Sequence, residues 1–591
     1  MMRDRPIALT LLSEQQAKAS RPPIYCYVGT DSDARERITA ALTHSTEVDL
    51  LDDVRRAEGE LRAPFLALIA EVGRLQRDRR AWHGTTLAWR DPEADSTFLA
   101  CCQVWAACRQ LEGLVPRQPM AIVAPDPWVR ITLARRLSLA EPRIPRTLLA
   151  ARLFRGIAAR SVWAWRAWRE ARAMRRAMSG AYPSGGVLLY SLYHPRCLVP
   201  PNDWRDPFFG NLDRLLEARS TTVLRLLPIG SNAPADDVAS RARYLLPQAA
   251  FASLGAVLRA ATARWTPIWP RDARLDGIDV TPLLEAAWWR DVGRAVWCHS
   301  ALFHSTLREI FARCRLRGFV WPFENQPWER MAVLAAREAS VRTVGYQHST
   351  VPRLSLNYFL APGQHADEPL PDVVVTAGRI QRDLLAGGGI PSRQVRIGGS
   401  LRYPSFSAQA ARERRAPEAG GRKRILVATA HHIGIARELD AALHTAFPDG
   451  GVADGIEFGW RPHPTLLDSD PRIGSWMGRV NGELAPQFDS FDAAITVGTT
   501  VALEARLLGI PVIRFRSATS TDLDPSDALP QWMIPVFDGR NAREAVLALF
   551  RTELHDQEDD LRRWRGALFA PVDMDVWTHV LDPDSSPCVP A

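Results

Sequence analysis

Residues 493–505 have the sequence AAITVGTTVALEA, which joins an apolar segment directly to a segment with helical spacing. Ala493–Val497 is short and apolar, and the glycine after it permits a tight turn, so a buried strand ending at residue 497 is expected. Thr499 and Thr500 stand where the next helix should begin, because a hydroxyl caps a first helical turn well. A strand followed at once by a helix is one βα unit, the repeating element of a parallel sheet.

The same alternation of apolar strands and helices continues on both sides of this unit. Downstream, strands are expected at 424–429, 456–461, 493–497 and 511–515, and helices at 434–446, 500–508 and 541–552. Upstream, strands are expected at 186–191, 222–227, 318–323, 343–346 and 372–376. Such alternation predicts parallel sheets. We therefore expect an α/β fold with two doubly wound parallel-sheet domains that face a cleft between their strand ends.

The length of 591 residues requires more than one hydrophobic core. Residues 405–423 are polar, contain Gly, Pro and Arg, and have no periodic pattern, which indicates a linker. We expect an N-terminal α/β extension at 1–145, a basic amphipathic helical segment at 146–180, Rossmann-like domains at 181–404 and 424–565, and a C-terminal tail at 566–591. In the extension, strands are expected at 23–28, 85–89 and 120–123.

One segment of the chain is unusually basic. Residues 152–176 contain eight arginines and a single acid, Glu170. At about 100° per residue, one helix face carries Phe154, Ile157, Ala158, Val162, Trp165 and Trp168, and off this face lie Arg152, Arg155, Arg160 and Arg166. Two interpretations stay open: a helix that lies in a membrane interface, and a helix that packs its apolar face on its own protein.

Composition narrows the class of protein. Apolar residues make up 46% of the chain and charged residues 24%, which is typical of globular proteins. No apolar run reaches the roughly 18–20 residues of a membrane span, and the start has no secretion signal, so a cytoplasmic location is expected. The net charge of +8 suits an anionic ligand or a membrane surface. The basic run is local and accompanies no nucleic-acid motif, so no nucleic-acid partner is expected.

Metal and cofactor sites are not expected. The eight cysteines are scattered without a Cys-x-x-Cys pair, which argues against structural zinc or an iron–sulfur cluster. A P-loop and a nucleophile elbow are also missing from the sequence. We predict neither a metal nor a bound cofactor.

The run Arg461-Pro462-His463-Pro464 follows another predicted strand. Each proline favours an extended conformation of the residue before it, so Arg461 and His463 are expected to project to one side of a stiff loop. An arginine and a histidine that point the same way suit a phosphate or a carboxylate.

The turn after strand 493–497 is the second predicted anion site. Gly498 allows a ligand to approach closely, and the N–H groups and hydroxyls at the helix start suit a phosphate. One turn into this helix, Glu504 can accept hydrogen bonds from ribose hydroxyls. The predicted nucleotide site therefore consists of Arg461, His463, Pro464, Gly498, Thr499, Thr500 and Glu504.

The upstream domain offers a carboxylate at a strand end. In the run Phe323-Glu324-Asn325-Gln326-Pro327-Trp328-Glu329, Pro327 fits the first helical position, and Glu329 lies near the third, where a carboxylate helps to cap the helix. Glu324 precedes the cap and is expected to face the cleft, as a general base for an acceptor hydroxyl or as a partner of a sugar hydroxyl.

Other polar residues follow strand ends. His348, after strand 343–346, is the second predicted catalytic residue, because it can touch a phosphate or relay a proton. Arg402 precedes the linker, and His431 and His432 follow strand 424–429. We expect these three residues to lie in the cleft.

With these motifs, residues 181–565 resemble bacterial surface-carbohydrate biosynthesis proteins, of capsule or O-antigen, of the GT-B glycosyltransferase type. The run at 323–329 looks like the signature of one family of them. His463-Pro464 and Thr499-Thr500 are similar to the HP and Ser/Thr motifs of bacterial sialyl- and Kdo-transferases, in which the matching residues hold the phosphate of a CMP-sugar. Gln347-His348 sits where glycerophosphate transferases of teichoic-acid synthesis carry a histidine near the cleft.

The resemblance implies a metal-independent glycosyltransferase that moves a sugar from a nucleotide-activated donor, such as a CMP-sugar, to a surface-polysaccharide or lipid-linked acceptor. It assigns the acceptor to residues 181–404 and the nucleotide to residues 424–565. The implied location is cytoplasmic, with peripheral contact to the inner membrane face through residues 152–176. Three alternatives stay open: a sugar-nucleotide epimerase, a glycerophosphate-type transferase, and a non-catalytic scaffold of a polysaccharide assembly complex.

Overall fold

The computed structural model describes most of the chain. The described residues are 9–93, 96–113, 119–178, 185–190, 198–199, 203–204, 206–231, 244–403, 406, 421–429, 431–463, 466, 470–482, 484–529, 534–551 and 558–582. Most of the expected linker at 405–423 lies outside these ranges, as does Pro464 of the predicted nucleotide site.

A parallel sheet of seven strands forms the first Rossmann-like domain, in the spatial order β15-β14-β13-β12-β5-β8-β9. Its strands are β5 (Val187–Tyr190), β8 (Val223–Leu227), β9 (Leu245–Pro247), β12 (Gly318–Pro322), β13 (Arg342–Gln347), β14 (Val373–Thr376) and β15 (Val395–Ile397). Along the chain the strands are added outward from β5 in one direction and then outward from β12 in the other. The topological switch point, where such sheets bind ligands, is therefore at the carboxyl ends of β5 and β12.

A parallel sheet of six strands forms the second domain, in the order β18-β17-β16-β19-β20-β21. Its strands are β16 (Lys423–Thr429), β17 (Ile456–Arg461), β18 (Gly478–Arg479), β19 (Ala493–Val497), β20 (Val512–Phe515) and β21 (Val536–Phe537). Along the chain the strands are added outward from β16 in one direction and then outward from β19 in the other, as in the first domain. The switch point therefore lies at the carboxyl ends of β16 and β19. Two doubly wound parallel sheets confirm the predicted fold class.

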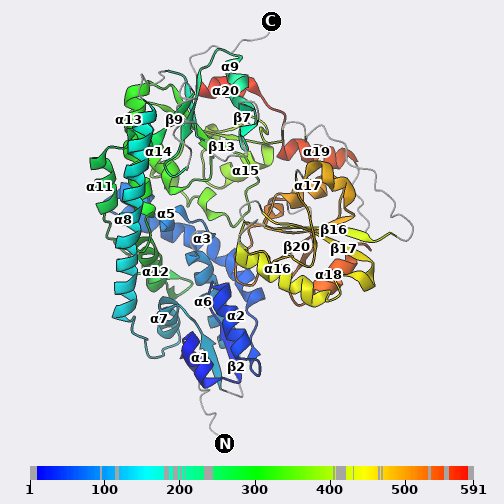
Figure 1. Cartoon of the computed structure of the whole chain (residues 1–591). Coiled ribbons are helices and arrows are strands. Elements are labelled where there is room, and N and C mark those ends of the chain that lie inside the picture. Colours follow the sequence, from blue (N-terminus) through cyan, green and yellow to red (C-terminus); the bar gives the residue numbers. More distant parts are fainter. Residues whose placement is uncertain are drawn as a thin grey trace, which may run out of the picture.

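Helices cover both sheets (Figure 1). The helices of the first domain are α9 (Leu212–Glu217), α11 (Leu254–Thr262), α12 (Thr281–Val292), α13 (Val296–Cys314), α14 (Pro327–Glu338) and α15 (Arg379–Gly387). Those of the second domain are α16 (Ile433–Ala446), α17 (Val501–Leu507) and α18 (Ala542–Ala548). Buried apolar side chains lie on both faces of each sheet, which is why its strands are apolar without alternation.

The N-terminal part has a sheet of its own, with the order β1-β4-β2-β3. Its strands are β1 (Leu9–Leu12), β2 (Ile24–Tyr27), β3 (Thr46–Glu47) and β4 (Met120–Val123), and its helices are α1 (Glu14–Ser20), α2 (Ser32–Ala41), α3 (Leu51–Leu75), α4 (Arg79–His83), α5 (Thr86–Trp89), α6 (Thr97–Gly113) and α7 (Pro127–Arg136). The strand predicted at 85–89 is wrong, because Thr85 caps helix α5 by accepting a hydrogen bond from the Ala88 N–H group.

This N-terminal part is not a separate appendage. Phe65 and Trp105 belong to the same buried apolar cluster as Phe323 and Phe359 of the first domain. The two parts therefore share one hydrophobic core, and loops of the N-terminal part have fixed positions relative to the first domain.

The prediction of a C-terminal tail at 566–591 needs correction, because this segment contains a packed helix. Helix α19 (Glu558–Leu568) lies on the second domain, and helix α20 (Met574–Leu581) returns to the first, beside α9 in Figure 1. Trp577 of α20 is fully buried, and its indole N–H donates to the Gly398 carbonyl at 3.0 Å. The chain thus crosses between the domains twice, and residues 574–581 belong to the core of the first domain.

Helix α8 (Arg146–Ala177) is the expected basic helix, and it runs along one edge of the molecule, far from the six-stranded sheet (Figure 1). Within the described ranges, no helix is long and apolar enough to cross a membrane.

Candidate functional site

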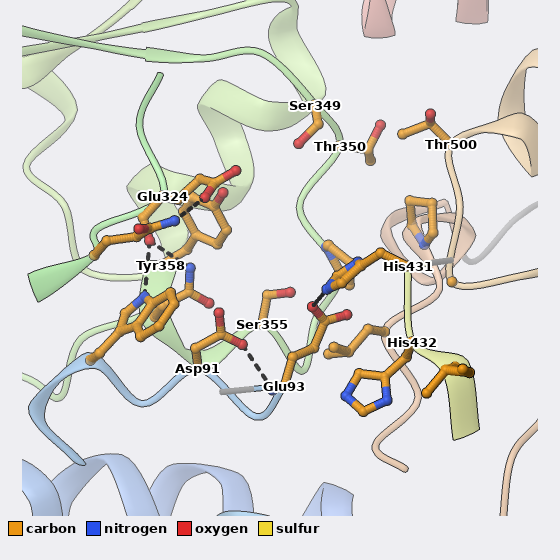
Figure 2. Close-up of a pocket in the computed structure, with 18 residues that line it drawn as sticks. Asp91, Glu93, Glu324, Ser349, Thr350, Ser355, Tyr358, His431, His432 and Thr500 are labelled. Carbon is orange, nitrogen blue, oxygen red and sulfur yellow. Dashed lines mark hydrogen bonds and ion pairs between the residues drawn. The ribbon is translucent and has the colours of Figure 1, made fainter. Parts of the chain in front are cut away.

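A cavity of about 610 Å³ lies where the two sheet domains and the N-terminal part meet. The residues that line it are Trp89, Asp91, Glu93, Glu324, Gln326, Ser349, Thr350, Pro352, Ser355, Asn357, Tyr358, His431, His432, Ile433, Gly498, Thr500, Leu523 and Pro525. Figure 2 shows Glu324 and Tyr358 on one side, and His431, His432 and Thr500 on the other. The cavity therefore has one wall from each doubly wound domain.

The wall from the second domain lies at its topological switch point. His431, His432 and Ile433 follow β16 and begin helix α16, and Gly498 and Thr500 follow β19, the neighbouring strand. Gly498 has a φ of +55°, which favours glycine and gives the tight turn that was predicted. Among the described residues, no side chain caps α16 at its N-cap residue, His432, so the N–H groups of its first turn and its positive end can meet a ligand at the cavity.

The wall from the first domain carries Glu324, directly after β12. Its position is fixed by Glu329, which is buried in the first turn of α14. The Glu329 carboxylate accepts hydrogen bonds from the backbone N–H groups of Glu324, Asn325 and Gln326 at 3.0 to 3.2 Å. Asn325 also has a φ of +53°, which turns the chain away from the strand. The predicted capping role of Glu329 is therefore also a positioning role for Glu324.

The electrostatic surroundings of Glu324 suit a general base. Burial raises the pKa of its carboxyl group. The hydrogen bond from the Gln326 amide works against this rise, Glu93 adds to it, and His431 works against it. A carboxylate whose pKa is raised accepts a proton more readily than an ordinary surface glutamate does.

The N-terminal part contributes a third wall that sequence reasoning missed. Asp91 and Glu93 enter the cavity from the loop between α5 and α6 (Figure 2). The Glu93 Oε2 atom lies 3.0 Å from Nε2 of His431, an ion pair that joins the N-terminal part to the second domain. The signal in the sequence is the acidic run Asp91-Pro92-Glu93, which directly follows the strand predicted at 85–89.

Hydroxyl and amide groups complete the cavity. Ser349, Thr350 and Ser355 belong to the loop after β13, and Asn357 and Tyr358 belong to the short 3-10 helix Leu356–Tyr358 that follows it. Such groups donate and accept hydrogen bonds to neutral polar ligands such as sugars. The sequence located this loop at a strand end but selected His348 within it.

The predicted site residues divide into two sets. Those that line the cavity are Glu324, His431, His432, Gly498 and Thr500, and those that do not are His348, Arg402, Arg461, His463, Thr499 and Glu504. In the second set, His463 lies next to the cavity, because its ring packs against that of His431 with 5.7 Å between the ring centroids.

The surroundings of His348 and Glu504 correct their predicted roles. His348 is buried against Phe208, and burial lowers its pKa to about 3, so it stays neutral and away from the cavity. Nη1 of Arg461 donates to the Val480 carbonyl at 3.3 Å, and the anion-binding role of Arg461 stays a prediction. Glu504 is buried and accepts hydrogen bonds from the hydroxyls of Tyr403 at 2.7 Å and Thr500 at 3.3 Å, so it is not directed toward a ribose.

Replacement of Glu93 by Gln is expected to lower the pKa of His431. The hydrogen-bonded Glu93 carboxylate raises the pKa of this imidazole, against the opposing effect of burial. The measurement is an NMR titration of the histidine rings, with the His431 signal assigned from a His431→Ala variant. Glu60→Gln, on the exposed surface of α3, is the matched control. An unchanged His431 titration in Glu93→Gln would show that the bridge does not form in solution.

Comparisons with solved structures gave similarity at low identity. The S. aureus MnaA–UDP structure has 12% identity and a TM-score of 0.38, over 67% of this chain and 96% of that chain. The UDP-GlcNAc 2-epimerase from Neisseria meningitidis bound to UDP-GlcNAc has 12% identity and a TM-score of 0.36, over 67% and 99%. The glycotransferase of kitacinnamycin has 14% identity and a TM-score of 0.38, over 68% and 100%. No family model and no curated protein sequence matches the chain.

The fold itself is established by the two sheets. Each has the doubly wound order, and their switch points face one cavity. The chain is therefore an α/β protein of GT-B-like architecture, as predicted. Among the described residues, no group of three or more His, Cys, Asp or Glu side chains is arranged to hold a metal ion.

Proposed function

We propose that this chain is a nucleotide-sugar-using enzyme, a glycosyltransferase whose donor and acceptor meet in the 610 Å³ cavity. One observation carries the proposal. The cavity joins the switch point of the second domain to Glu324, which lies at the switch point of the first. Ligands of doubly wound domains bind at switch points, so two ligands brought together in this way can react with each other.

The second domain is assigned the nucleotide. The start of α16 supplies backbone N–H groups and a positive helix end suited to a phosphate. The Thr500 hydroxyl, which donates to Glu504 at 3.3 Å without a ligand, would turn its proton to the phosphate. His432 lies at the same edge of the cavity. The proposed anion site therefore combines the start of α16 with Thr500, the residue before α17 that the sequence also selected.

The first domain is assigned the acceptor. In the proposed reaction the acceptor hydroxyl oxygen bonds to the anomeric carbon of the donor, and the bond from that carbon to the phosphate oxygen breaks. Glu324 takes the hydroxyl proton, and the leaving phosphate keeps the electron pair and its negative charge at α16. The resemblance in sequence favours a CMP-sugar as donor and a surface-polysaccharide or lipid-linked acceptor, and both belong to this proposal.

Nucleotide binding tests the assignment. Thr500→Val is expected to weaken nucleotide affinity by about 10- to 100-fold, since a hydrogen bond to a charged group contributes about 1.5–3 kcal/mol. Thr499→Val is a close control, because its hydroxyl accepts a hydrogen bond from the Val501 N–H group and does not line the cavity. The measurement is calorimetric titration of both variants with CMP, CDP, UDP and GDP. Equal losses in the two variants, or none in either, would overturn the assignment of the phosphate to this wall.

An epimerase is a second candidate, favoured by the carboxylates in the cavity. Asp91, Glu93 and Glu324 all line it, and epimerisation at a sugar carbon needs groups that remove a proton and return it. Incubation with the nucleotide-sugar alone separates the two functions. An epimerised nucleotide-sugar would identify an epimerase, whereas a transferase leaves the sugar configuration unchanged until an acceptor is added.

A further inference from the structure

Helix α8 contacts the rest of the protein through its small side chains. The buried residues of this helix are Gly156, Ala167, Ala171 and Met174. A Cβ atom on Gly156 would lie 2.1 Å from the carbonyl oxygen of Val292, so the helix backbone packs directly on the end of α12. A helix that docks through small residues leaves its large side chains for the opposite face.

The opposite face carries the apolar stripe, which the sequence could not orient. Phe154 is 71% exposed, and Ile157 and Trp165 are each 54% exposed. The described residues include ten large apolar side chains that are exposed, and seven of them lie on α8 or on α11, which packs beside it. Exposed apolar side chains that gather on two neighbouring helices mark a contact with another surface.

The same helix holds the whole excess charge of the protein. Arg146–Ala177 contains nine arginines and one glutamate, a net charge of +8, which equals the net charge of the entire chain. Some of these arginines contact the rest of the protein. The guanidinium groups of Arg152 and Arg160 lie over the rings of Trp128 and Trp297, and that of Arg175 donates to the Ala252 carbonyl at 2.7 Å. Arg155, Arg166 and Arg169 are exposed on or beside the apolar stripe.

We propose that the exposed face of α8 docks on an anionic phospholipid bilayer. A bilayer surface matches both features at once: its acyl boundary takes up Phe154, Ile157 and Trp165, and its phosphates pair with the flanking arginines. Two other occupants fit less well. A second copy of the chain would bring two helices of charge +8 together, and a nucleic acid would leave the apolar stripe without a partner.

The arrangement of single side chains fits an interfacial helix. The Arg169 guanidinium lies 4.6 Å from the centroid of the Trp165 ring, and that of Arg172 lies 5.8 Å from the Trp168 ring. Long arginine stems can keep their charge at the phosphate level while neighbouring indole rings lie deeper. This docking does not depend on the proposed reaction, because α8 contributes no residue to the cavity.

Vesicle flotation of the full-length protein tests the docking. The probes are vesicles of phosphatidylcholine alone and vesicles of equimolar phosphatidylcholine and phosphatidylglycerol. The intact protein should float only with the anionic vesicles, and added salt should weaken this binding. The double variant Phe154→Ser, Trp165→Ser should lose at least about tenfold in affinity. Neutralising Arg155, Arg166 and Arg169 to Gln should cost about fivefold for each charge removed.

Two controls separate docking from loss of structure. Val452→Ser removes a side chain that is equally exposed, at 54%, on the second domain, and should float like the intact protein. Nucleotide titration should be unchanged in all α8 variants, so failure of the docking is distinguishable from failure of the proposed function. The proposal is overturned if the protein ignores anionic vesicles or floats unchanged in the α8 variants. It is also overturned if the Phe154/Trp165 variant instead abolishes a dimer seen by light scattering, or if the arginine variants instead abolish binding to an oligonucleotide.

Discussion

Glu324→Gln is expected to lower kcat by about 10²- to 10⁴-fold, the range found when a general base is removed. The substitution keeps the shape of the side chain but removes its capacity to take a proton. The nucleotide should still bind, because the anion site at α16 and Thr500 belongs to the other wall of the cavity. The measurement is single-turnover sugar transfer, with nucleotide affinity determined on the same preparation.

The pH dependence of the activity is an independent test of the same residue. Burial raises the pKa of Glu324, and only the deprotonated carboxylate can act as a base. Activity should therefore rise as the pH rises through a midpoint above that of an ordinary glutamate, and this acid limb should disappear in Glu324→Gln. Glu338→Gln is the control, since this carboxylate of α14 pairs with His304 and Arg308 outside the cavity. Full activity in Glu324→Gln would show that Glu324 is not the general base.

Glu368→Ala is expected to destabilise the protein by about 3–5 kcal/mol, the usual effect of removing one partner from a buried ion pair. Glu368 is buried. Its carboxylate lies 3.9 Å from the guanidinium group of Arg90 in the N-terminal part and 3.7 Å from that of Arg330 in α14, and both arginines are also buried. The Arg90 guanidinium makes no hydrogen bond within the described residues, so the Glu368 carboxylate is the group that balances its buried positive charge. Without this carboxylate, two buried cations would remain where the N-terminal part joins the first domain.

The pKa of the Glu368 carboxyl group predicts how the stability of the folded protein depends on pH. Burial raises the pKa of Glu368, but Arg330, Arg90 and His83 outweigh burial and hold its pKa at about 2. A carboxyl group with a depressed pKa stabilises the fold above its unfolded pKa, and this contribution is lost as the pH falls toward about 2. Urea unfolding between neutral and acidic pH measures it. Glu457→Ala, at a half-exposed position on β17, is the control, and equal stability of the two variants would contradict the prediction.

Much of the fold could be predicted from local pattern. Every strand expected in the two sheet domains is present, because buried parallel strands are apolar runs bounded by glycine and polar residues. Within these two large sheets, the strands that were not predicted are β9, β15, β18 and β21, which are the outer ones of each sheet. They are two or three residues long, too short to show a period.

The candidate site could be predicted only in part. Glu324, His431, His432, Gly498 and Thr500 follow strands of apolar sequence, and the ends of parallel strands meet at one edge. His348 and Arg461 also follow strands, but their side chains turn into neighbouring structure. Whether a residue after a strand faces the cavity depends on loop conformation, which the sequence does not give.

The sequence by itself determined what depends on neighbouring residues: the strands, the helices, the doubly wound class and the positive charge of α8. Only the tertiary structure decided what depends on distant segments. It brought Glu93 against His431, across more than half the chain, and it turned the apolar stripe of α8 outward. The physical reason is that a helical period shows which residues share a face, whereas the packing of other segments decides which face is buried.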